Sequence, residues 1–324
     1  MWAYVVRRLL LLVPTVLGIV LLTFCLFSVV AGDPARQYAG KSATPQVLEG
    51  IRAKMGLNKP RFALNNDAYR RTGRASALLD NQFFDVLLLR FPKSMQYDES
   101  VWSLFKRKAP VSLAIQLPIF VLSLGVTLGL SLLAAARRGT ALDSGMTVGA
   151  IGLMSVPGVS VYLIAQWLFG AQLRWFPVAG WDGGFYALQY AALPVLVGVV
   201  AGLGGGVRFY RAVALEEVGA DYVRTGRAKG VGENDLLLVH VLRNIMIPVI
   251  TGTITTLPLL FLGALILEQT FQIPGLGGLL AAAVLNSDRP VVMFIVYVTS
   301  VIYCLALVVN DIAYTWADPR VVLK

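Results

Sequence analysis

The sequence has few charged residues, one histidine and two cysteines, and each shortage excludes a class of protein. Only 14% of the 324 residues are charged, whereas a soluble domain carries roughly 25%. A single histidine excludes a multi-histidine metal centre. Cys25 and Cys304 both lie in long apolar stretches, so they predict neither a disulfide framework nor a CxxC site. The remainder of the composition is mainly apolar.

Long runs without charge predict an all-α, polytopic membrane protein. A helix needs about 20 apolar residues to cross the hydrocarbon core of a bilayer. Six stretches meet this length: 9–31, 109–136, 144–173, 183–207, 244–267 and 291–310. A seventh, 269–287, is interrupted at Pro274 and predicts a re-entrant or surface piece, because irregular backbone survives at membrane depth only when buried in protein or lining a cavity.

The first apolar stretch follows Arg7-Arg8, as a secretory signal would. A signal has an apolar core of about 7–15 residues. Stretch 9–31 is longer, and other apolar stretches follow it. A retained signal anchor is therefore favoured over a cleaved signal.

Basic residues predict the orientation of these spans, because cytoplasmic segments carry an excess of lysine and arginine. With the N-terminus inside, the short outer loops carry only Arg174 and Arg289, and both termini are cytoplasmic. Residues 1–31 then form the tail and first span, 32–108 an extracytoplasmic loop or subdomain, and 109–324 the transmembrane core with spans two to six. Within 32–108, Thr44-Pro45 begins a helix that Gly56 ends, whereas the polar segment 61–80 is expected to be poorly fixed.

Several glycine pairs are spaced four residues apart inside the predicted spans, which lets helix backbones approach closely. The bland interpretation is packing within this chain, and the alternative is contact with a second subunit. The pairs are Gly125 and Gly129, Gly145 and Gly149, Gly198 and Gly202, and Gly202 and Gly206.

The sequence contains no convincing nucleotide-binding loop. Gly40-Lys41-Ser42 matches the end of the pattern, but position 35 is alanine where the pattern requires glycine. The match follows Asp33-Pro34 instead of an apolar strand, and it would face outside. We therefore expect the chain to bind no nucleotide or other cofactor and to hydrolyse no ATP alone.

The formal net charge of +10 could indicate a nucleic-acid partner. In a membrane protein the same excess follows from orientation and from attraction to anionic lipid headgroups. We expect contact with membrane lipids and no nucleic acid.

Segment 208–243 is the informative part of the inner face. Asp221 is expected to cap a short helix, and Gly230 to end it in the left-handed conformation that glycine tolerates. A second helix is expected to begin near Asn234 and run into span five. The residues alone indicate either a charged helical hairpin or a solvated loop.

This segment resembles a known family, the inner-membrane permeases of the dipeptide, oligopeptide and nickel class of ATP-binding-cassette (ABC) importers. Residues 221–230 are similar to that class's version of the permease coupling motif, with His240 and Arg243-Asn244 at the familiar distance. Gly226 departs from the usual alanine. The resemblance implies that coupling to the ATPase subunits depends on Asp221, Tyr222, Arg224, Thr225, Gly226, Arg227, Ala228, Lys229 and Gly230.

Other class signatures occur along nearly the whole chain. Glu268, Phe271, Ile273-Pro274-Gly275-Leu276-Gly277, Asp288, Pro290, Asn310-Asp311, Tyr314 and Asp318-Pro319-Arg320 follow the class pattern, as do Tyr4, Arg7-Arg8-Leu9, Pro14, Gly56-Leu57 and Pro60. One departure is Phe91-Pro92-Lys93-Ser94, where the class usually has a Gly-Arg-Ser-like turn.

The resemblance implies a transport subunit and not an enzyme, in a bacterial inner membrane. Its expected partners are a second, related permease, two cytoplasmic ATPase subunits that hold ATP and Mg, and an extracytoplasmic solute-binding protein. Cargo in the class ranges from dipeptides and oligopeptides to nickel chelates, glycosides and peptide antibiotics.

Two other functions would need features that the sequence shows weakly. A secondary transporter needs ionisable residues within the spans or paired broken helices, whereas Glu268 and Asp311 fall at span ends and only the Pro274 region reads as broken. A membrane-embedded enzyme needs a catalytic cluster inside the spans, and none is visible.

The predicted orientation can be tested with single cysteines. We expect Ser76→Cys and Asp182→Cys to react with an impermeant thiol reagent in sealed, right-side-out vesicles, because both positions lie outside. Lys229→Cys should react only after the vesicles are opened. Labelling of Lys229→Cys in intact vesicles would show that the orientation is wrong.

Overall fold

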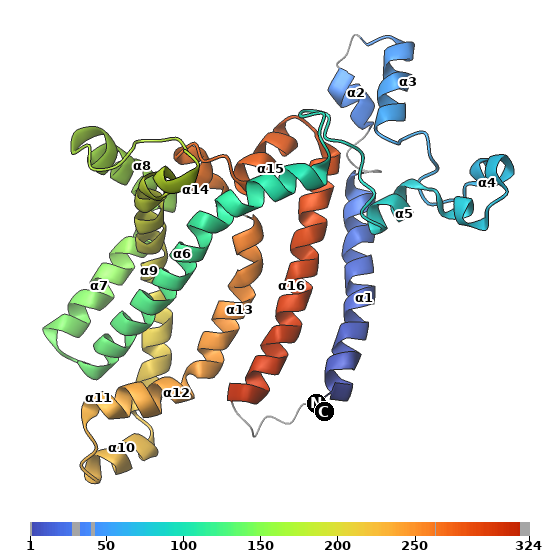
Figure 1. The fold of residues 1–324 in the computed structure, drawn as a ribbon. Helices are drawn as coiled ribbons and strands as arrows, with labels where there is room; N and C mark the ends of the chain where they lie inside the picture. Colours follow the sequence, from blue (N-terminus) through green and yellow to red (C-terminus); the bar gives the residue numbers. More distant parts are fainter. Residues whose placement is uncertain (1, 28–32, 40–42, 263, 318–324) are drawn as a thin grey trace. The chain divides into compact units, whose positions relative to one another are not determined.

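Every regular element in the described part of the chain is a helix. The computed structural model describes residues 2–27, 33–39, 43–262 and 264–317 (Figure 1). Among these residues, four helices are long and apolar enough to cross a membrane: α1 (Trp2–Cys25), α6 (Val101–Ala136), α9 (Ala187–Val218) and α16 (Arg289–Ala317). Two bent helix pairs raise the number to six if each counts as one span. The predicted all-α polytopic fold is confirmed.

The third predicted stretch, 144–173, is not one continuous helix. It consists of α7 (Ala141–Ser155), α8 (Gly158–Ala165) and the π-helical η3 (Gln166–Gln172), with a 94° bend between α7 and the rest. Pro157 lies in the break, where it cannot donate a backbone hydrogen bond and restricts the residue before it. A single charge-free run in the sequence thus conceals a sharp turn.

The stretch around span five is also divided. It begins with α11 (Glu233–Asp235), the π-helical η5 (Leu236–Val241) and α12 (Leu242–Asn244), then bends by 58° at Ile245 into α13 (Met246–Leu262). The helices α14 (Leu265–Thr270) and α15 (Leu276–Leu285) flank the interruption at Pro274. The expectation that only the Pro274 region is broken is therefore wrong.

The chain divides into two compact units. Unit 1 contains Met1–Pro110 and Gly275–Val308, and unit 2 contains Val111–Pro274 and Val309–Lys324. Unit 1 holds the short helices α2 (Pro34–Ala39), α3 (Pro45–Lys54), α4 (Asn66–Thr72), η2 (Ala75–Leu79) and α5 (Gln82–Leu87).

The short helices of unit 1 match one local prediction and contradict another. Helix α3 begins with Pro45 in its first turn, and Gly56 follows its end with a φ of 68°. Segment 61–80 was expected to be poorly fixed, and this is wrong. Asn65 caps α4 by accepting from the Ala68 amide at 3.0 Å and donates to the Asp80 carbonyl at 2.8 Å. These side-chain bonds act together with Phe62, which packs against Phe24 and Phe83.

The departure at 91–94 retains a structural serine. The Ser94 hydroxyl donates to the buried Asp288 carboxylate at 2.5 Å, and the Gln96 amide donates to the same oxygen at 3.3 Å. Phe91 also packs edge-on against Phe294 of α16. The loop is thus fixed to the first turns of α16 within unit 1.

Helix α9 is the centre of unit 2, and its glycines bring α6 and α7 close. A methyl group on Gly204 would lie 2.7 Å from the Ala150 carbonyl oxygen of α7, and one on Gly206 would lie 2.7 Å from Thr127 of α6. Gly198 similarly contacts Ile119 of α6. These α9 glycines therefore pack within the chain, as the bland interpretation predicted. Gly125, Gly129, Gly145 and Gly149 have no atom within 4 Å of such a methyl group.

An ion pair fixes the turn between α6 and α7 to α9. Asp143, in the first turn of α7, accepts from Arg211 Nε at 2.6 Å and from Arg211 Nη2 at 2.8 Å. The Gly139 amide donates to the same carboxylate at 3.0 Å. A two-pronged pair of this kind is geometrically specific, so it orients the connection between the two helices.

The close contact at Gly204 predicts that alanine substitutions at two neighbouring glycines differ sharply in their effect on stability. Gly204→Ala should destabilise the protein by about 1–3 kcal/mol, because the added methyl group meets fixed backbone of α7. Gly205→Ala is the matched control, since nothing lies within 4 Å of its added methyl group and alanine favours a helix. Thermal unfolding of the detergent-purified variants measures the difference. Equal melting of the two would contradict the packing described.

Candidate functional site

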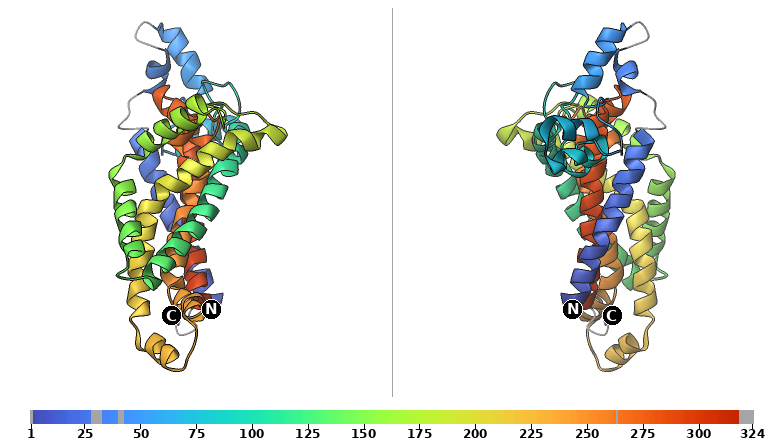
Figure 2. Two further views of the ribbon diagram at one scale, coloured as in Figure 1. Left: turned by 90° about the vertical axis from the view of Figure 1, so that its left-hand side faces the viewer. Right: turned by 90° about the vertical axis from the view of Figure 1, so that its right-hand side faces the viewer.

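The hairpin formed by α10 (Asp221–Ala228) and α11–α12 projects beyond the end of α9 (Figures 1 and 2). Val223 is its buried anchor, with 1% of its surface exposed. It belongs to an apolar cluster with Leu132 and Ala135 of α6, Tyr210 and Ala214 of α9, Leu236, Leu237 and Val241 of η5, and Ile245 and Val249. We call this the hairpin cluster. It joins the hairpin to α6, α9 and α13.

The start of α10 differs by one residue from the prediction. Ala220 occupies the N-cap position, and no side chain caps the helix. Asp221 instead lies in the first turn, where its negative charge is favourable near the helix N-terminus. The Tyr222 hydroxyl donates to Glu217 at 2.8 Å, which connects the start of α10 to the last turn of α9.

The end of α10 is formed as predicted. Gly230 has a φ of 79°, in the left-handed region. The Gly230 amide donates to the Arg227 carbonyl at 3.0 Å, and the Val231 amide donates to the Gly226 carbonyl at 3.1 Å. These two bonds are the Schellman pattern, which satisfies carbonyls at a helix end. The turn sends the chain directly back into α11.

Gly226 has a structural reason to depart from the usual alanine. A methyl group there would lie 2.6 Å from Leu236 Cδ2, on η5. Because Leu236 is almost fully buried in the hairpin cluster, glycine lets α10 approach η5. Gly226 therefore allows closer packing of α10 on η5.

Arg227 connects the two arms of the hairpin through a residue that the sequence analysis missed. Its guanidinium donates to Glu233 of α11 at 2.5 and 3.0 Å. Donation to Glu233 raises the pKa of the Arg227 guanidinium. The sequence contained one sign of this ion pair. An arginine and a glutamate lie six residues apart, on either side of the predicted glycine turn.

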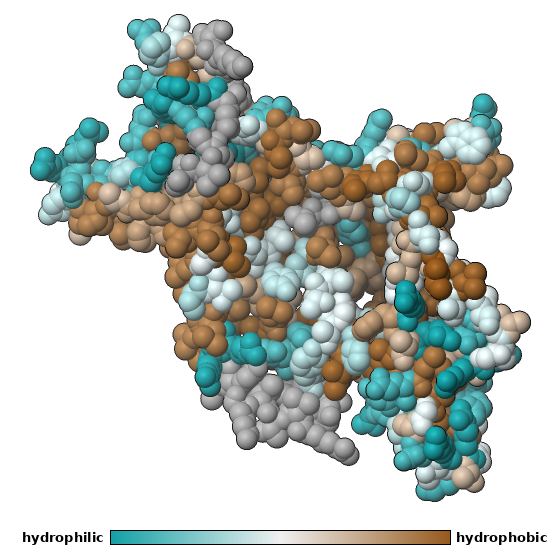
Figure 3. All heavy atoms as spheres, turned by 180° about the vertical axis from the view of Figure 1, so that it is seen from behind, coloured by the Kyte–Doolittle hydropathy of each residue, from teal (hydrophilic) through white to brown (hydrophobic). Residues whose placement is uncertain are grey.

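Most side chains of α10 other than Val223 face solvent. Exposed residues of the motif are Asp221, Tyr222, Arg224, Thr225, Arg227, Ala228, Lys229 and Gly230. Figure 3 shows hydrophilic residues gathered over the end of unit 2 that carries the hairpin. The hairpin therefore presents a charged, rigid surface that is suited to contact with another protein.

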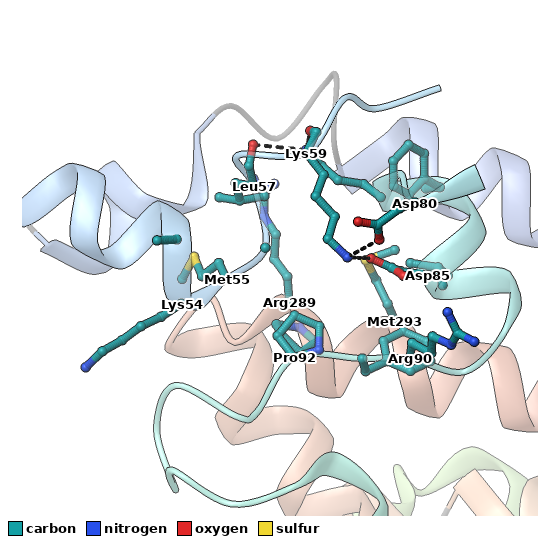
Figure 4. A pocket seen from close by; sticks show the side chains of 17 residues that line it. Lys54, Met55, Leu57, Lys59, Asp80, Asp85, Arg90, Pro92, Arg289 and Met293 are labelled. Atoms are coloured by element: carbon teal, nitrogen blue, oxygen red, sulfur yellow. Dashed lines mark hydrogen bonds and ion pairs between the residues drawn. The ribbon is translucent and has the colours of Figure 1, made fainter. Parts of the chain in front are cut away.

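A second candidate feature is a cavity of about 430 Å³ in unit 1 (Figure 4). Met55, Pro92 and Met293 contribute apolar walls. Lys59 extends across it and donates to Asp80 and Asp85, each at 2.6 Å. Burial alone would lower the pKa of the Lys59 ammonium, but these bonds raise it above its usual value. The Lys59 ammonium is thus paired with both carboxylates and holds Lys59, Asp80 and Asp85 together.

Glu268, at the end of an apolar run, is buried in the structure. The sequence placed Glu268 at the end of a span, where a carboxylate would reach water. In the structure it is instead 1% exposed and accepts from the Ser112 hydroxyl at 2.6 Å. Burial by α6 could not be read from the position of Glu268 at the end of an apolar run. Gly40-Lys41-Ser42 and Asp318-Pro319-Arg320 lie outside the described residues.

Comparison with known proteins places two family matches on the chain. Residues 125–323 match the family described as binding-protein-dependent transport system inner membrane component. Residues 1–116 match the N-terminal family of the same membrane components.

Full-length relatives have consistent names. The chain is 33% identical over 322 residues to the glutathione transport system permease protein of Salmonella paratyphi A. It is 31% identical over 325 residues to a Brucella abortus protein named as a peptide transport system permease. It is 28% identical over 332 residues to the oligopeptide transport system permease protein of Bacillus subtilis. Each alignment covers 99% of both chains.

The left-handed turn predicts a local effect at Gly230. Gly230→Val should cost about 1–2 kcal/mol, because a β-branched residue adopts this backbone only with strain. Gly232→Val is the matched control, since Gly232 has a φ of −63°. Limited proteolysis of the purified variants should show faster cleavage between α10 and α11 in Gly230→Val alone. Equal cleavage of both variants would contradict the assigned turn.

Proposed function

This chain belongs to the family of binding-protein-dependent transport system inner membrane components, and on that premise we propose that its α10–α11 hairpin is the surface on which the importer's ATPase subunits act. The sequence resemblance to importer permeases is confirmed. The protein is a multi-pass component of the bacterial inner membrane and a permease subunit of an ABC importer. It is a transport subunit and not an enzyme.

The rigidity of the hairpin carries the proposal. Val223 anchors α10 in the hairpin cluster, the Gly230 turn fixes the direction of the return, and Arg227 joins α10 to Glu233. A force on α10 therefore moves the hairpin as one body. Because the hairpin cluster includes residues of α6, α9 and α13, that motion passes to the helices of unit 2.

The exposed side chains indicate how a partner would be held. Arg224 and Asp221 form an ion pair at 3.5 Å within α10, but Arg224 leaves 73% of its side chain exposed and Asp221 leaves 96%. So exposed a pair contributes little to stability. Exposed charges of this kind give specificity and register at a protein interface. We assign coupling to Asp221, Tyr222, Arg224, Thr225, Gly226, Arg227, Ala228, Lys229 and Gly230, with Glu233 as the residue that positions Arg227.

The full importer contains further subunits in this proposal. A second, related permease completes the path, two ATPase subunits bind ATP and Mg on the cytoplasmic side, and a solute-binding protein delivers cargo from outside. This chain binds no nucleotide. The family description, which names a binding-protein-dependent system, supports this assembly.

Peptides are the proposed cargo. The relatives in Salmonella, Brucella and Bacillus are named for glutathione, peptide and oligopeptide transport. Glutathione is itself a small peptide, so all three names share one chemical class. The orientation proposed from the basic residues places unit 1's short helices on the side where such cargo arrives.

Charge reversal on α10 tests the coupling surface. Arg224→Glu with Arg227→Glu should cause loss of the ATPase subunits on purification and reduce peptide uptake by more than about tenfold, because like charges across an interface cost several kcal/mol. Arg70→Glu with Arg71→Glu, an exposed pair on α4, is the matched control and should retain the ATPases. Normal ATPase retention and uptake in the α10 variant would place coupling elsewhere.

A further inference from the structure

A groove of about 470 Å³ lies within unit 2, between one face each of α6, α9 and α13. On α6 it runs from Gln116 to Thr127. Eleven residues of helix rise about 16 Å, which equals about four or five residues of an extended chain. The groove is therefore long enough for the backbone of a short peptide.

The groove has a mainly apolar lining that carries a few neutral polar groups and no charge. Its polar lining residues are Gln116, Ser123, Thr127, Tyr210, Thr253 and Thr256, and none of its lining residues is aspartate, glutamate, lysine, arginine or histidine. Neutral amides and hydroxyls are the complement of a peptide backbone, which offers one donor and one acceptor per residue. They would not neutralise an ionic ligand.

Two hydroxyls in this lining have unused hydrogen-bonding capacity. Ser123 Oγ and Thr253 Oγ1 are buried and have no hydrogen-bond partner among the described residues. Thr251 and Thr255, also on α13, instead donate to backbone carbonyls at 2.8 and 2.7 Å. A buried hydroxyl without a partner is costly, and rotation about its side-chain bond would bring it to a ligand in the groove.

A second groove in unit 2 has an almost entirely apolar lining and serves as a comparison. That groove, of about 530 Å³, is lined by apolar side chains such as Val161, Leu168, Phe169 and Leu196. Acyl chains need no hydrogen bonds, so they suit this apolar groove. The hydroxyls and the amide of the first groove would be unfavourable against hydrocarbon.

Glycines of α9 line one side of the groove that contains Ser123 and Thr253. Gly198 and Gly206 have no room for a methyl group against α6, whereas Gly202 does: its added methyl group would approach only Ser123 Oγ, at 3.9 Å. The side of α9 next to Ser123 is therefore bare backbone. This leaves space beside the unpartnered hydroxyl without loosening the contacts above and below it.

We propose that this groove is the part of the solute path contributed by this chain, and that it holds an extended peptide through hydrogen bonds to backbone amides and not through ion pairs. The proposal rests on the proposed function and adds the contact residues and the basis of selectivity. Side-chain charge on the peptide should matter little at this site, and length should matter more.

Accessibility in the assembled importer tests the groove independently of cargo identity. In a chain carrying Cys25→Ala and Cys304→Ala, Ser123→Cys and Thr253→Cys should each react with a small water-soluble methanethiosulfonate in at least one nucleotide state. A mixture of di- to penta-alanine should slow the reaction. Thr255→Cys, on α13 but outside the groove lining, is the control and should not be protected. Reaction with hydrophobic maleimides alone, or cross-linking to the second permease without any reaction, would overturn the proposal.

Uptake kinetics supply the second test. Ser123→Ala with Thr253→Val should raise the apparent KM for peptide by about threefold to thirtyfold, as expected for two lost hydrogen bonds. Ala-Ala-Ala, Ala-Lys-Ala and Ala-Glu-Ala should be affected alike. Thermal stability should not fall, because neither hydroxyl has a protein partner to lose. The control Thr255→Val should leave KM unchanged.

A wrong cargo and a wrong peptide site would give different results. If the wild-type complex hydrolyses ATP with no uptake of any of these peptides, peptide cargo is wrong, and the cysteine reactions still decide whether the groove is open to water. If wild-type uptake is normal and the double variant has an unchanged KM, the groove is not the peptide site, although the importer function stands.

Discussion

Burial of Val223 in the hairpin cluster is the contact on which the functional architecture depends. It holds a short, highly charged helix against the ends of three membrane helices, where that helix alone would be too short to persist in water. With Val223 fixed, the Gly230 turn and the Arg227–Glu233 pair need only set the direction in which the chain returns from α10 to α11. The exposed charges are then free for a partner.

Helices α6, α9 and α13 connect the hairpin cluster to the groove that contains Ser123 and Thr253. Tyr210 of α9 belongs to the hairpin cluster and also lines the groove. A methyl group added to Gly252 of α13 would lie 2.7 Å from the Tyr210 hydroxyl oxygen. A displacement of the hairpin would therefore reach the groove directly through the Tyr210 side chain, without an intervening loop. Close packing makes such a contact stiff, which suits the transmission of motion.

Features that depend on composition or on one backbone conformation could be read from the sequence. The long apolar runs, the α3 start at Pro45 and the turn at Gly230 are of this kind. Features that depend on a partner distant in sequence could not. The burial of Glu268 needs Ser112, 156 residues away, and the role of Gly226 needs Leu236. Pro157 was visible in the sequence, but the surrounding apolar run concealed its 94° bend.

The bend at Pro157 also has a consequence for the lipid around the protein. Helix α7 has 15 residues, a rise of about 22 Å, against a hydrocarbon thickness of about 30 Å. Beyond Pro157 the chain bends away from the α7 axis. Helix α7 is therefore about 8 Å shorter than the hydrocarbon layer. Thinning the bilayer to match costs a fraction of a kcal/mol per Å. The short α7 therefore predicts a locally thinner bilayer beside this helix.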